Sequence, residues 1–369
     1  MVSRIVGVVT AILAERPGAQ EIQALSSDDA SLRNALNLTD LTGVVAVGDT
    51  VVLNTVAVEL QLGTGGLDFV VSSSPNRLPD APAKGHLLKL RYTPLQTPVL
   101  AVESPESPYH EAVAQFQSLY ELPVVCMELH SHLPAVCAGI HWAEQAHNLP
   151  RPLKIVYIMT DASSLSLSLS RLVPILKAQN LLHATVTVGQ AFGGDYEAIN
   201  LYSGMAFAKE VLQADVIIAG QGPGNAGTQT PLGFSGVDQG LAVNATASLG
   251  GSAILVPRIS FAEKRHHHHG MSLHTITILR QIVRAPVWVP IPRLPVEQLV
   301  RICTMMEELD MGDEVQTTII DTEQSISELE KLRPYLSTMG RGLDEETPFF
   351  LAGAAAGILA VQLSEIYVA

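Results

Sequence analysis

The chain has 369 residues, 47% hydrophobic and 16% charged, and its 22 Lys and Arg against 36 Asp and Glu give a formal net charge of −14. This composition supplies a large apolar core and excludes a wholly disordered chain or a long coiled coil. The acidic balance argues against nucleic acid or an anionic membrane surface as the main partner. The length predicts two or three domains.

The cysteine count and the apolar runs indicate where the protein works. Three cysteines spread over a long chain form no disulfide framework, so we expect a reducing cytoplasm. The apolar run at residues 5–13 resembles the start of a signal peptide. It is rich in β-branched residues and no small-residue cleavage site follows, so it predicts a first β-strand. The apolar stretch at 351–363 is too short to span a membrane. We therefore expect a soluble cytoplasmic protein.

Residues 1–104 are predicted to form a small N-terminal β-barrel domain that ends in a proline-rich connection. The expected strands are residues 5–13, 44–47, 51–54 continued through 56–62, 67–72 and 87–92. Gly48 and Asp49 lie between two of these runs and suit a tight hairpin turn. Short strands at such spacing are typical of a small barrel.

Residues 105–369 are predicted to form an α/β domain, because short apolar runs alternate there with helical patterns. The expected strands are residues 123–130, 154–160, 184–189, 215–220, 252–258, 285–289 and 314–321. The expected helices are residues 164–170, 196–212, 237–249, 296–309, 322–336 and 348–363. This alternation predicts a doubly wound, mainly parallel, Rossmann-like sheet. The last helix carries a small-residue surface for close packing, either inside the fold or across a homodimer interface.

Polar and glycine-rich segments follow five successive strands, where ligands bind in open parallel sheets. After the first strand come Glu128, His130 and His132, which share a face if the chain is extended. They form a metal site, another kind of site, or an ordinary polar strand end. After the second strand, Asp161 and Ser163 form a helix cap or expose amides to an anion.

The third and fourth strands are followed by glycine turns. Gln190 lies in the first turn, and Asp195 and Glu197 follow as general base, metal ligand or partners of a helix dipole. After the fourth strand, the spacing of glycines matches a dinucleotide fingerprint, in Gly222, Gly224, Gly227 and the adjoining Thr228. Proline interrupts that loop, the helix starts late and no acid ends the next strand. Another anion-cradling loop or a plain turn is therefore favoured over a dinucleotide site.

The fifth strand leads into a basic loop. Its candidate residues are Arg258, Ser260, Lys264, Arg265 and the four histidines 266–269, with His274 a turn into the next helix. Arginine pairs with carboxylate or phosphate, and histidine changes charge near neutral pH. The loop is a clamp for an anionic ligand, a metal site or a solvated loop.

Four segments together carry a resemblance to a known family: residues 53–66, 194–204, 222–228 and 257–262. They resemble a bacterial family defined only as a domain of unknown function, and the likeness covers most of the chain. The resemblance implies a bacterial cytoplasmic protein. It assigns no activity, substrate or catalytic residue.

The leading hypothesis is a hydrolase or transferase that acts on a small anionic metabolite, phosphorylated or nucleotide-like. The loop 222–228 holds the anion with Arg258, Lys264 and Arg265. Asp195 or Glu197 acts as general base or metal ligand, and His130 or a histidine such as His266 as acid or base. The alternatives are a non-catalytic sensor or scaffold, and a metal-dependent hydrolase on a closed (β/α)₈ barrel with a divalent metal. The acidic surface and apolar last helix predict a homodimer.

Overall fold

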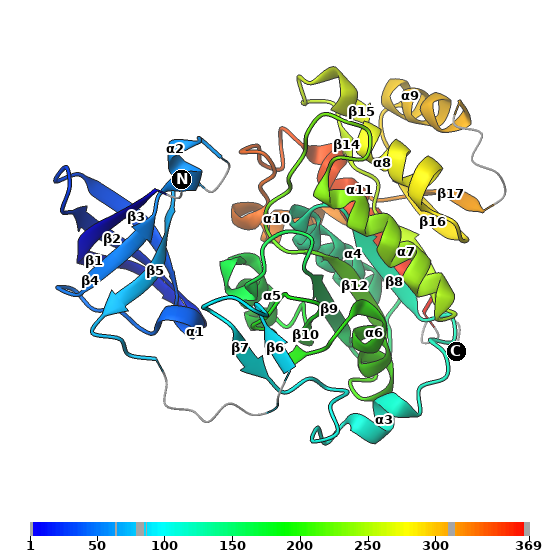
Figure 1. Cartoon of the computed structure of the whole chain (residues 1–369). Coiled ribbons are helices and arrows are strands. Elements are labelled where there is room, and N and C mark those ends of the chain that lie inside the picture. Colours follow the sequence, from blue (N-terminus) through cyan, green and yellow to red (C-terminus); the bar gives the residue numbers. More distant parts are fainter. Residues whose placement is uncertain (1–2, 63–64, 79–84, 86, 309–313, 365–369) are drawn as a thin grey trace. The chain divides into compact units, whose positions relative to one another are not determined.

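The computed structural model describes residues 3–62, 65–78, 85, 87–308 and 314–364. The chain divides into two compact units, Met1–Val99 with Ser166–Leu169, and Leu100–Leu165 with Ser170–Ala369. Figure 1 labels the helices and strands of both units.

The first unit contains a closed barrel with the strand order β1-β2-β3-β5-β4. Its strands are β1 (Arg4–Arg16), β2 (Ala19–Ser26), β3 (Leu32–Leu38), β4 (Thr50–Asn54) and β5 (Asp68–Ser74), with short helices α1 (Thr39–Thr42) and α2 (Val56–Glu59). Val9, Ile22, Val51 and Leu53 fill the interior. Closure leaves no strand edge exposed, which stabilises so small a sheet. The predicted barrel is confirmed. Beside it in sequence, β6 (Leu87–Lys89) and β7 (Thr97–Val99) form a two-stranded sheet.

Two predictions for the barrel are wrong because local polar contacts override the apolar pattern. Residues 44–47 form no strand, since Asp49 accepts hydrogen bonds from the Ala46 N–H and from Arg77 and holds that segment in a turn. Val56–Glu59 is helical, and the Asn54 side chain accepts from the N–H of its first residue. The strands β2 and β3 were missed because buried polar side chains, such as Gln20 bonded to Asn37, interrupt their hydrophobic alternation.

The second unit is built on a parallel sheet of eight strands in the order β11-β10-β9-β12-β8-β13-β16-β17. The strands are β8 (Pro123–Met127), β9 (Ile155–Thr160), β10 (Ala184–Thr187), β11 (Tyr196–Glu197), β12 (Val216–Gln221), β13 (Ser252–Leu255), β16 (Val287–Pro292) and β17 (Val315–Ile320). All seven predicted strands are present, which confirms the Rossmann-like α/β class. The sheet is open, with edges at β11 and β17, so the closed (β/α)₈ barrel is wrong.

The connections of this sheet change direction among its central strands. Those after β8 and β9 lead toward β11, whereas those after β12 and β13 lead toward β17. Because crossovers are right-handed, helices of the two sets cover opposite faces, and Figure 1 shows α6 and α7 on one of them. In open α/β sheets, ligands bind beyond the carboxyl ends of the strands at the point where connections diverge in this way.

The helices of this unit follow the prediction less closely than the strands. They are α3 (His110–Ala114), α4 (Leu133–Ala146), α5 (Leu172–Ala178), α6 (Leu201–Glu210), α7 (Asp238–Ser248), α8 (Leu273–Thr277), α9 (Val296–Glu307), α10 (Ile326–Lys331) and α11 (Thr347–Gln362); a small hairpin pairs β14 (Ile259–Ser260) with β15 (Gly270–Met271). Helix α4 was missed. The predicted helix at 164–170 is wrong, because Ser170 accepts the N–H groups of Leu172 and Val173 and starts α5 only there. The predicted helix at 196–212 begins late, at Leu201, where Asn200 caps it.

The small-residue surface of α11 packs inside the fold, against α4. A Cβ on Gly139 of α4 would lie 2.1 Å from the carbonyl oxygen of Ala354, and one on Gly357 of α11 would lie 2.2 Å from that of Val136. Glycine at both positions therefore permits backbone contact between the two helices. The predicted homodimer is not needed to explain these glycines and stays a prediction.

Candidate ligand-binding site at the carboxyl edge of the sheet

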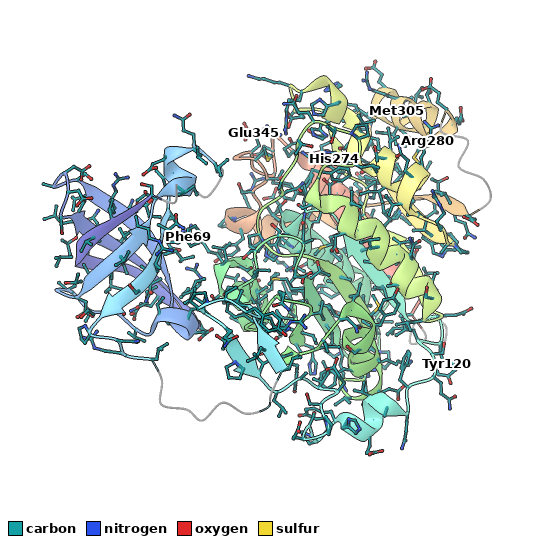
Figure 2. All side chains as sticks on the ribbon, in the orientation of Figure 1. Phe69, Tyr120, His274, Arg280, Met305 and Glu345 are labelled. Carbon is teal, nitrogen blue, oxygen red and sulfur yellow. The ribbon has the colours of Figure 1, made fainter. Side chains whose placement is uncertain are left out.

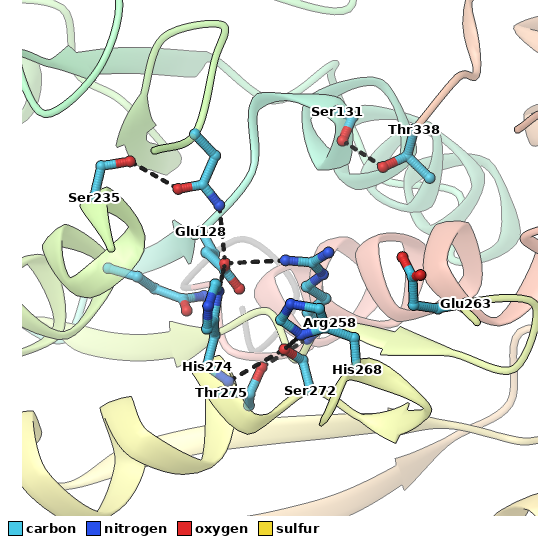
Figure 3. Close-up of polar contacts among 12 residues, drawn as sticks. Glu128, Ser131, Ser235, Arg258, Glu263, His268, Ser272, His274, Thr275 and Thr338 are labelled. Atoms are coloured by element: carbon cyan, nitrogen blue, oxygen red, sulfur yellow. Dashed lines mark hydrogen bonds and ion pairs between the residues drawn. The ribbon is translucent and has the colours of Figure 1, made fainter. Parts of the chain in front are cut away.

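A buried carboxylate joins the segments that follow three central strands. Glu128 comes directly after β8 and is fully buried. Its Oε1 atom accepts hydrogen bonds from His274 Nδ1 at 2.7 Å, Asn225 Nδ2 at 3.2 Å and Arg258 Nη1 at 3.4 Å (Figure 3). Asn225 lies in the loop after β12, Arg258 follows β13, and His274 is in α8. We call these four residues the Glu128 group.

Neighbouring polar residues hold the Glu128 group in place. The hydroxyl of Ser235 donates to Asn225 Oδ1 at 2.7 Å, which points the amide nitrogen toward Glu128. The hydroxyl of Ser272 accepts from the His274 N–H at 3.2 Å and caps α8. In the first turn of the same helix, Thr275 Oγ1 accepts the backbone N–H of Arg258 at 3.0 Å. The start of α8 thus positions both Arg258 and His274.

Close packing around Glu128 leaves no room for a residue larger than glycine at position 236. A Cβ on Gly236 would lie 2.4 Å from the Cγ atom of Glu128. The ring of Phe234 stacks on His274 with centroids 3.8 Å apart and planes within 9°. The turn before α7 therefore packs Gly236 against Glu128 and the ring of Phe234 against His274.

Glu128 is a carboxylate at neutral pH despite its burial. Burial by itself raises the pKa of Glu128, because charge is costly away from water. The hydrogen bond from His274 and the positive charge of Arg258 outweigh that effect, so the pKa lies below its ordinary value. The ionised group accepts hydrogen bonds only, so His274 Nδ1 carries the proton in their contact.

Several polar atoms around Glu128 lack protein partners. Among the described residues, Glu128 Oε2 is buried without a hydrogen bond, and both ring nitrogens of the buried His132 are also unpartnered. Arg258 is 6% exposed, and its single side-chain hydrogen bond to a described residue is the one from Nη1 to Glu128. Buried polar groups nearly always have partners, so these atoms can accept hydrogen bonds from, or donate them to, water or another polar molecule.

Two histidines near the group are neutral. Burial lowers the pKa of His132 to about 3, and its ring stacks on Phe349 of α11 with centroids 3.9 Å apart. Burial and the positive charge of Arg258 lower the pKa of His268 to about 3. His268 Nδ1 lies 2.6 Å from the hydroxyl of Ser272, and its ring meets that of His274 edge-on at 4.7 Å.

The first predicted cluster is only partly assembled. Residues His130–His132 form a 3₁₀ turn that leads into α4, so the extended geometry assumed for Glu128, His130 and His132 is wrong. His130 Nε2 lies 2.7 Å from the hydroxyl of Ser170, and Nδ1 lies 3.2 Å from that of Tyr157. Burial lowers the pKa of His130 to about 4. Both ring nitrogens of His130 have hydrogen-bond partners in the core, so this histidine stabilises the fold.

The structure does not bring Asp195 and Glu197 to the Glu128 group. Asp195 accepts from Lys177 Nζ at 2.5 Å and from the N–H of Thr185 at 2.8 Å. Glu197 accepts from the Gly193 N–H and the Thr187 hydroxyl, each at 2.7 Å. Thr185 and Thr187 belong to β10, which two strands separate from β8. These acids hold the connection from β10 to β11.

Other predicted residues meet at the carboxyl ends of β9, β10 and β12. Asp161 accepts the Gln190 N–H at 2.8 Å, and the hydroxyl of Ser163 donates to the carbonyl of Pro223 at 3.0 Å. Since α5 begins only at Leu172, neither Asp161 nor Ser163 caps it. They tie together the loops after three neighbouring strands.

The glycine loop after β12 is a turn that contacts Glu128 through Asn225. A Cβ on Gly222 would lie 2.8 Å from the sulfur of Met159, and Gly224 has a φ of +100°. Gly227 pairs with Phe234, and Thr228 donates its N–H to the carbonyl of Gly233 at 2.8 Å. These pairings make the loop a hairpin, and α7 starts well after it. A dinucleotide fingerprint requires a helix that opens directly after the glycines, and this helix is missing here. The loop instead contacts Glu128 through Asn225.

Among the described side chains of the basic loop, Arg258 alone is hydrogen-bonded to Glu128. Arg265 donates to Glu263 at 2.8 Å and, by this hydrogen bond, holds the pKa of that carboxyl well below its usual range. The Ser260 hydroxyl donates to Glu346 at 3.0 Å. Lys264 is exposed, with no hydrogen bond or ion pair to a described residue. The side chain of His266 lies outside the described part of the chain.

Searching the described residues finds no group of three His, Cys, Asp or Glu side chains that could hold a metal ion. Within the same residues, no helix is long and apolar enough to cross a membrane.

The sequence reasoning missed Asn225 and Ser235. The only sequence signal for Asn225 is weak: it is an amide side chain within a loop made mostly of small residues. Ser235 shows no signal in sequence, because its partner lies ten residues earlier across the hairpin.

Fold and site together define a Rossmann-like α/β protein with a buried carboxylate, imidazole and guanidinium at the carboxyl edge of its sheet. The chain belongs to the family described as "Protein of unknown function (DUF3866)", whose model matches residues 34–357. This match confirms the resemblance to a domain of unknown function. A search of curated proteins finds no match to the chain.

Proposed function

We propose that the protein is a hydrolase or transferase that binds a small anionic metabolite at the Glu128 group and uses His274 as general base. One observation carries the proposal. The buried carboxylate of Glu128 accepts a hydrogen bond from His274 Nδ1 at 2.7 Å, beside an arginine with unused donors. A base oriented by an acid, next to an anion-binding cation, is a catalytic arrangement.

The contact with Glu128 prepares His274 for proton transfer. With the proton held on Nδ1, the lone pair of Nε2 is free to take a proton from water or a substrate hydroxyl. The His274 side chain is 18% exposed, and Nε2 has no hydrogen-bond partner among the described residues. The base is therefore both oriented and accessible.

Arg258 provides the binding side of the proposal. Its side chain is 7% exposed, so an anion beside it is bound away from bulk water, where the attraction is strong. A phosphate or carboxylate group on a small molecule suits this guanidinium.

One observation favours a second candidate, a sensor that binds the same anion without turnover. Among the described residues, no Ser, Thr or Cys side chain is hydrogen-bonded to His274 Nε2, so no protein nucleophile is in place. A water or a second substrate must then be the nucleophile. If neither reacts, the site only binds.

Binding is tested by thermal unfolding and calorimetry on the full chain with inorganic phosphate, AMP and glucose 6-phosphate at millimolar concentration. We expect at least one of them to raise the Tm of the wild type, and Arg258→Met to lose that response. Arg265→Ala is the matched control, because this arginine of the same loop pairs with Glu263. The proposal is overturned if no compound shifts the wild-type Tm, or if Arg258→Met responds like the wild type.

Catalysis is tested on a panel of phosphate and carboxylate esters, including p-nitrophenyl phosphate. We expect His274→Asn to bind the anion but to lose about a hundredfold or more in turnover, as removal of a general base does. Wild-type binding without turnover of any ester supports the sensor instead. Unchanged turnover in His274→Asn overturns the role of His274.

A further inference from the structure

A pocket of about 410 Å³ lies in the second unit, apart from the residues of the Glu128 group. Three segments line it: Phe261 and Ala262 after β14, the connection from β16 into α9, and the start of α11. We call it the β16 pocket. Its volume is within the range of about 300–1,000 Å³ that small-molecule sites occupy.

The inner wall of the β16 pocket is apolar. Leu294 and Leu351 are 7% and 6% exposed. Phe261 is half-buried beside them, and the ring of His269 holds it edge-on at 5.5 Å between centroids. A flat apolar group gains by leaving water for such a wall.

One polar atom of the wall lacks a partner. Gln298, in the first turn of α9, lines the pocket, and its Oε1 atom is buried without a hydrogen bond to any described residue. An amide oxygen accepts hydrogen bonds only, so it requires an N–H or O–H donor. A ligand that carries such a donor would satisfy it.

The charges at the mouth disfavour an anion. Arg293 lies 3.6 Å from Asp321, and Asp344 accepts from Arg333 at 2.6 Å. Glu345 accepts the Gly342 N–H at 3.2 Å and is exposed, with no ion pair to a described residue. Figure 2 labels Glu345 of this pocket and His274 of the Glu128 group. The mouth therefore carries one more negative than positive side chain.

We propose that the β16 pocket binds a small neutral or cationic molecule with a flat apolar ring and one N–H donor, a heteroaromatic amine by chemical class. The ring lies against Phe261 and the two leucines, and the N–H donates to Gln298 Oε1. The ligand differs in charge from the anion proposed for Arg258, so the two sites are chemically separate.

Two probes of similar size and shape test the donor. Indole has a ring N–H, and benzothiophene has sulfur in its place. Saturation-transfer NMR on the full chain should show indole binding about tenfold more tightly than benzothiophene, the ratio that corresponds to one hydrogen bond of about 1.4 kcal/mol. Tryptamine should bind more tightly than indole-3-acetate, because the mouth is acidic.

The variant Gln298→Leu should bind both probes equally, and Gln298→Glu, which keeps an acceptor, should retain the preference for indole. Retention of the preference in Gln298→Leu, or no preference in the wild type, overturns the proposal, as does failure of indole to bind the wild type. His274→Asn should bind indole like the wild type, and inorganic phosphate should not compete. The two sites can therefore fail independently.

Discussion

Acidic residues follow β8 and β10 of the same sheet, and the two sets differ in how many of their carboxylate oxygens accept hydrogen bonds. Asp195 and Glu197 each accept hydrogen bonds at both carboxylate oxygens. Glu128 gathers three donors on Oε1 and has none among the described residues on Oε2. An acid whose oxygens are all bonded holds the chain in shape. An acid with a buried, unbonded oxygen has capacity for a ligand.

Burial separates the two regions further. The side chain of Asp195 is 35% exposed, whereas that of Glu128 is 0% exposed. A buried charge depends on its partners for stability, whereas water replaces the partners of an exposed one. The following substitutions test this difference, from the largest expected effect to the smallest.

Removal of the buried carboxylate should cost the most. In Glu128→Ala the buried positive charge of Arg258 loses its partner and His274 Nδ1 loses its acceptor, so we expect the free energy of unfolding to fall by about 3–5 kcal/mol. Urea unfolding at pH 8 measures this. Glu128→Gln keeps the shape and an acceptor, and should lose less. A loss below about 1 kcal/mol in Glu128→Ala contradicts the view that this carboxylate balances the buried charges.

The next effect depends on pH and concerns His132. Its pKa is about 3 in the folded chain against an ordinary 6.5, so only the unfolded chain takes up a proton between these values. The stability that neutral His132 contributes is therefore complete above about pH 6.5 and is lost as the pH falls toward 3. His132→Phe keeps a ring to stack on Phe349 and removes the titration.

We expect His132→Phe to gain about 3 kcal/mol relative to the wild type when the pH is lowered from 8 to 4. Urea unfolding at both values gives the comparison. His268 titrates in the same range in both proteins, so its contribution cancels. Equal pH dependence of the two proteins would show that His132 is not held neutral by burial.

Truncation of a fully bonded acid should cost less. Glu197→Ala loses the hydrogen bonds from the Gly193 N–H and the Thr187 hydroxyl, so we expect a loss of about 1–2 kcal/mol. Binding of phosphate at Arg258 should not change, since Glu197 holds the turn between β10 and β11, and three strands separate β10 from β13, which Arg258 follows. A changed phosphate affinity with unchanged stability would assign Glu197 to the site.

The smallest effect is expected at the exposed acid. Asp195→Asn keeps an acceptor for Thr185 and loses the ion pair with Lys177, which water partly replaces. We expect a loss of about 0.5 kcal/mol, smaller at high salt. A loss as large as that of Glu128→Ala would remove the distinction between the two regions.

Sequence reasoning located the strands better than the site. Apolar runs such as residues 155–160 are local patterns, and they predicted seven of the eight parallel strands. Helix α4 was missed because its polar start, His130–His132, was interpreted as the end of a strand. Arg258 was predicted as a ligand-binding residue, and the structure brings it to Glu128. The partners Asn225 and Ser235 could not be predicted from pattern.

The sequence by itself determined the barrel, the open parallel sheet and the edge at which polar residues gather, because hydrophobic periodicity acts over a few neighbouring residues. Only the tertiary structure decided which polar atoms are bonded to one another. Arg258 and His274 lie 130 and 146 residues from Glu128 in the chain. Hydrogen bonds over such separations depend on how the strands are ordered in the sheet, and no local pattern encodes that order.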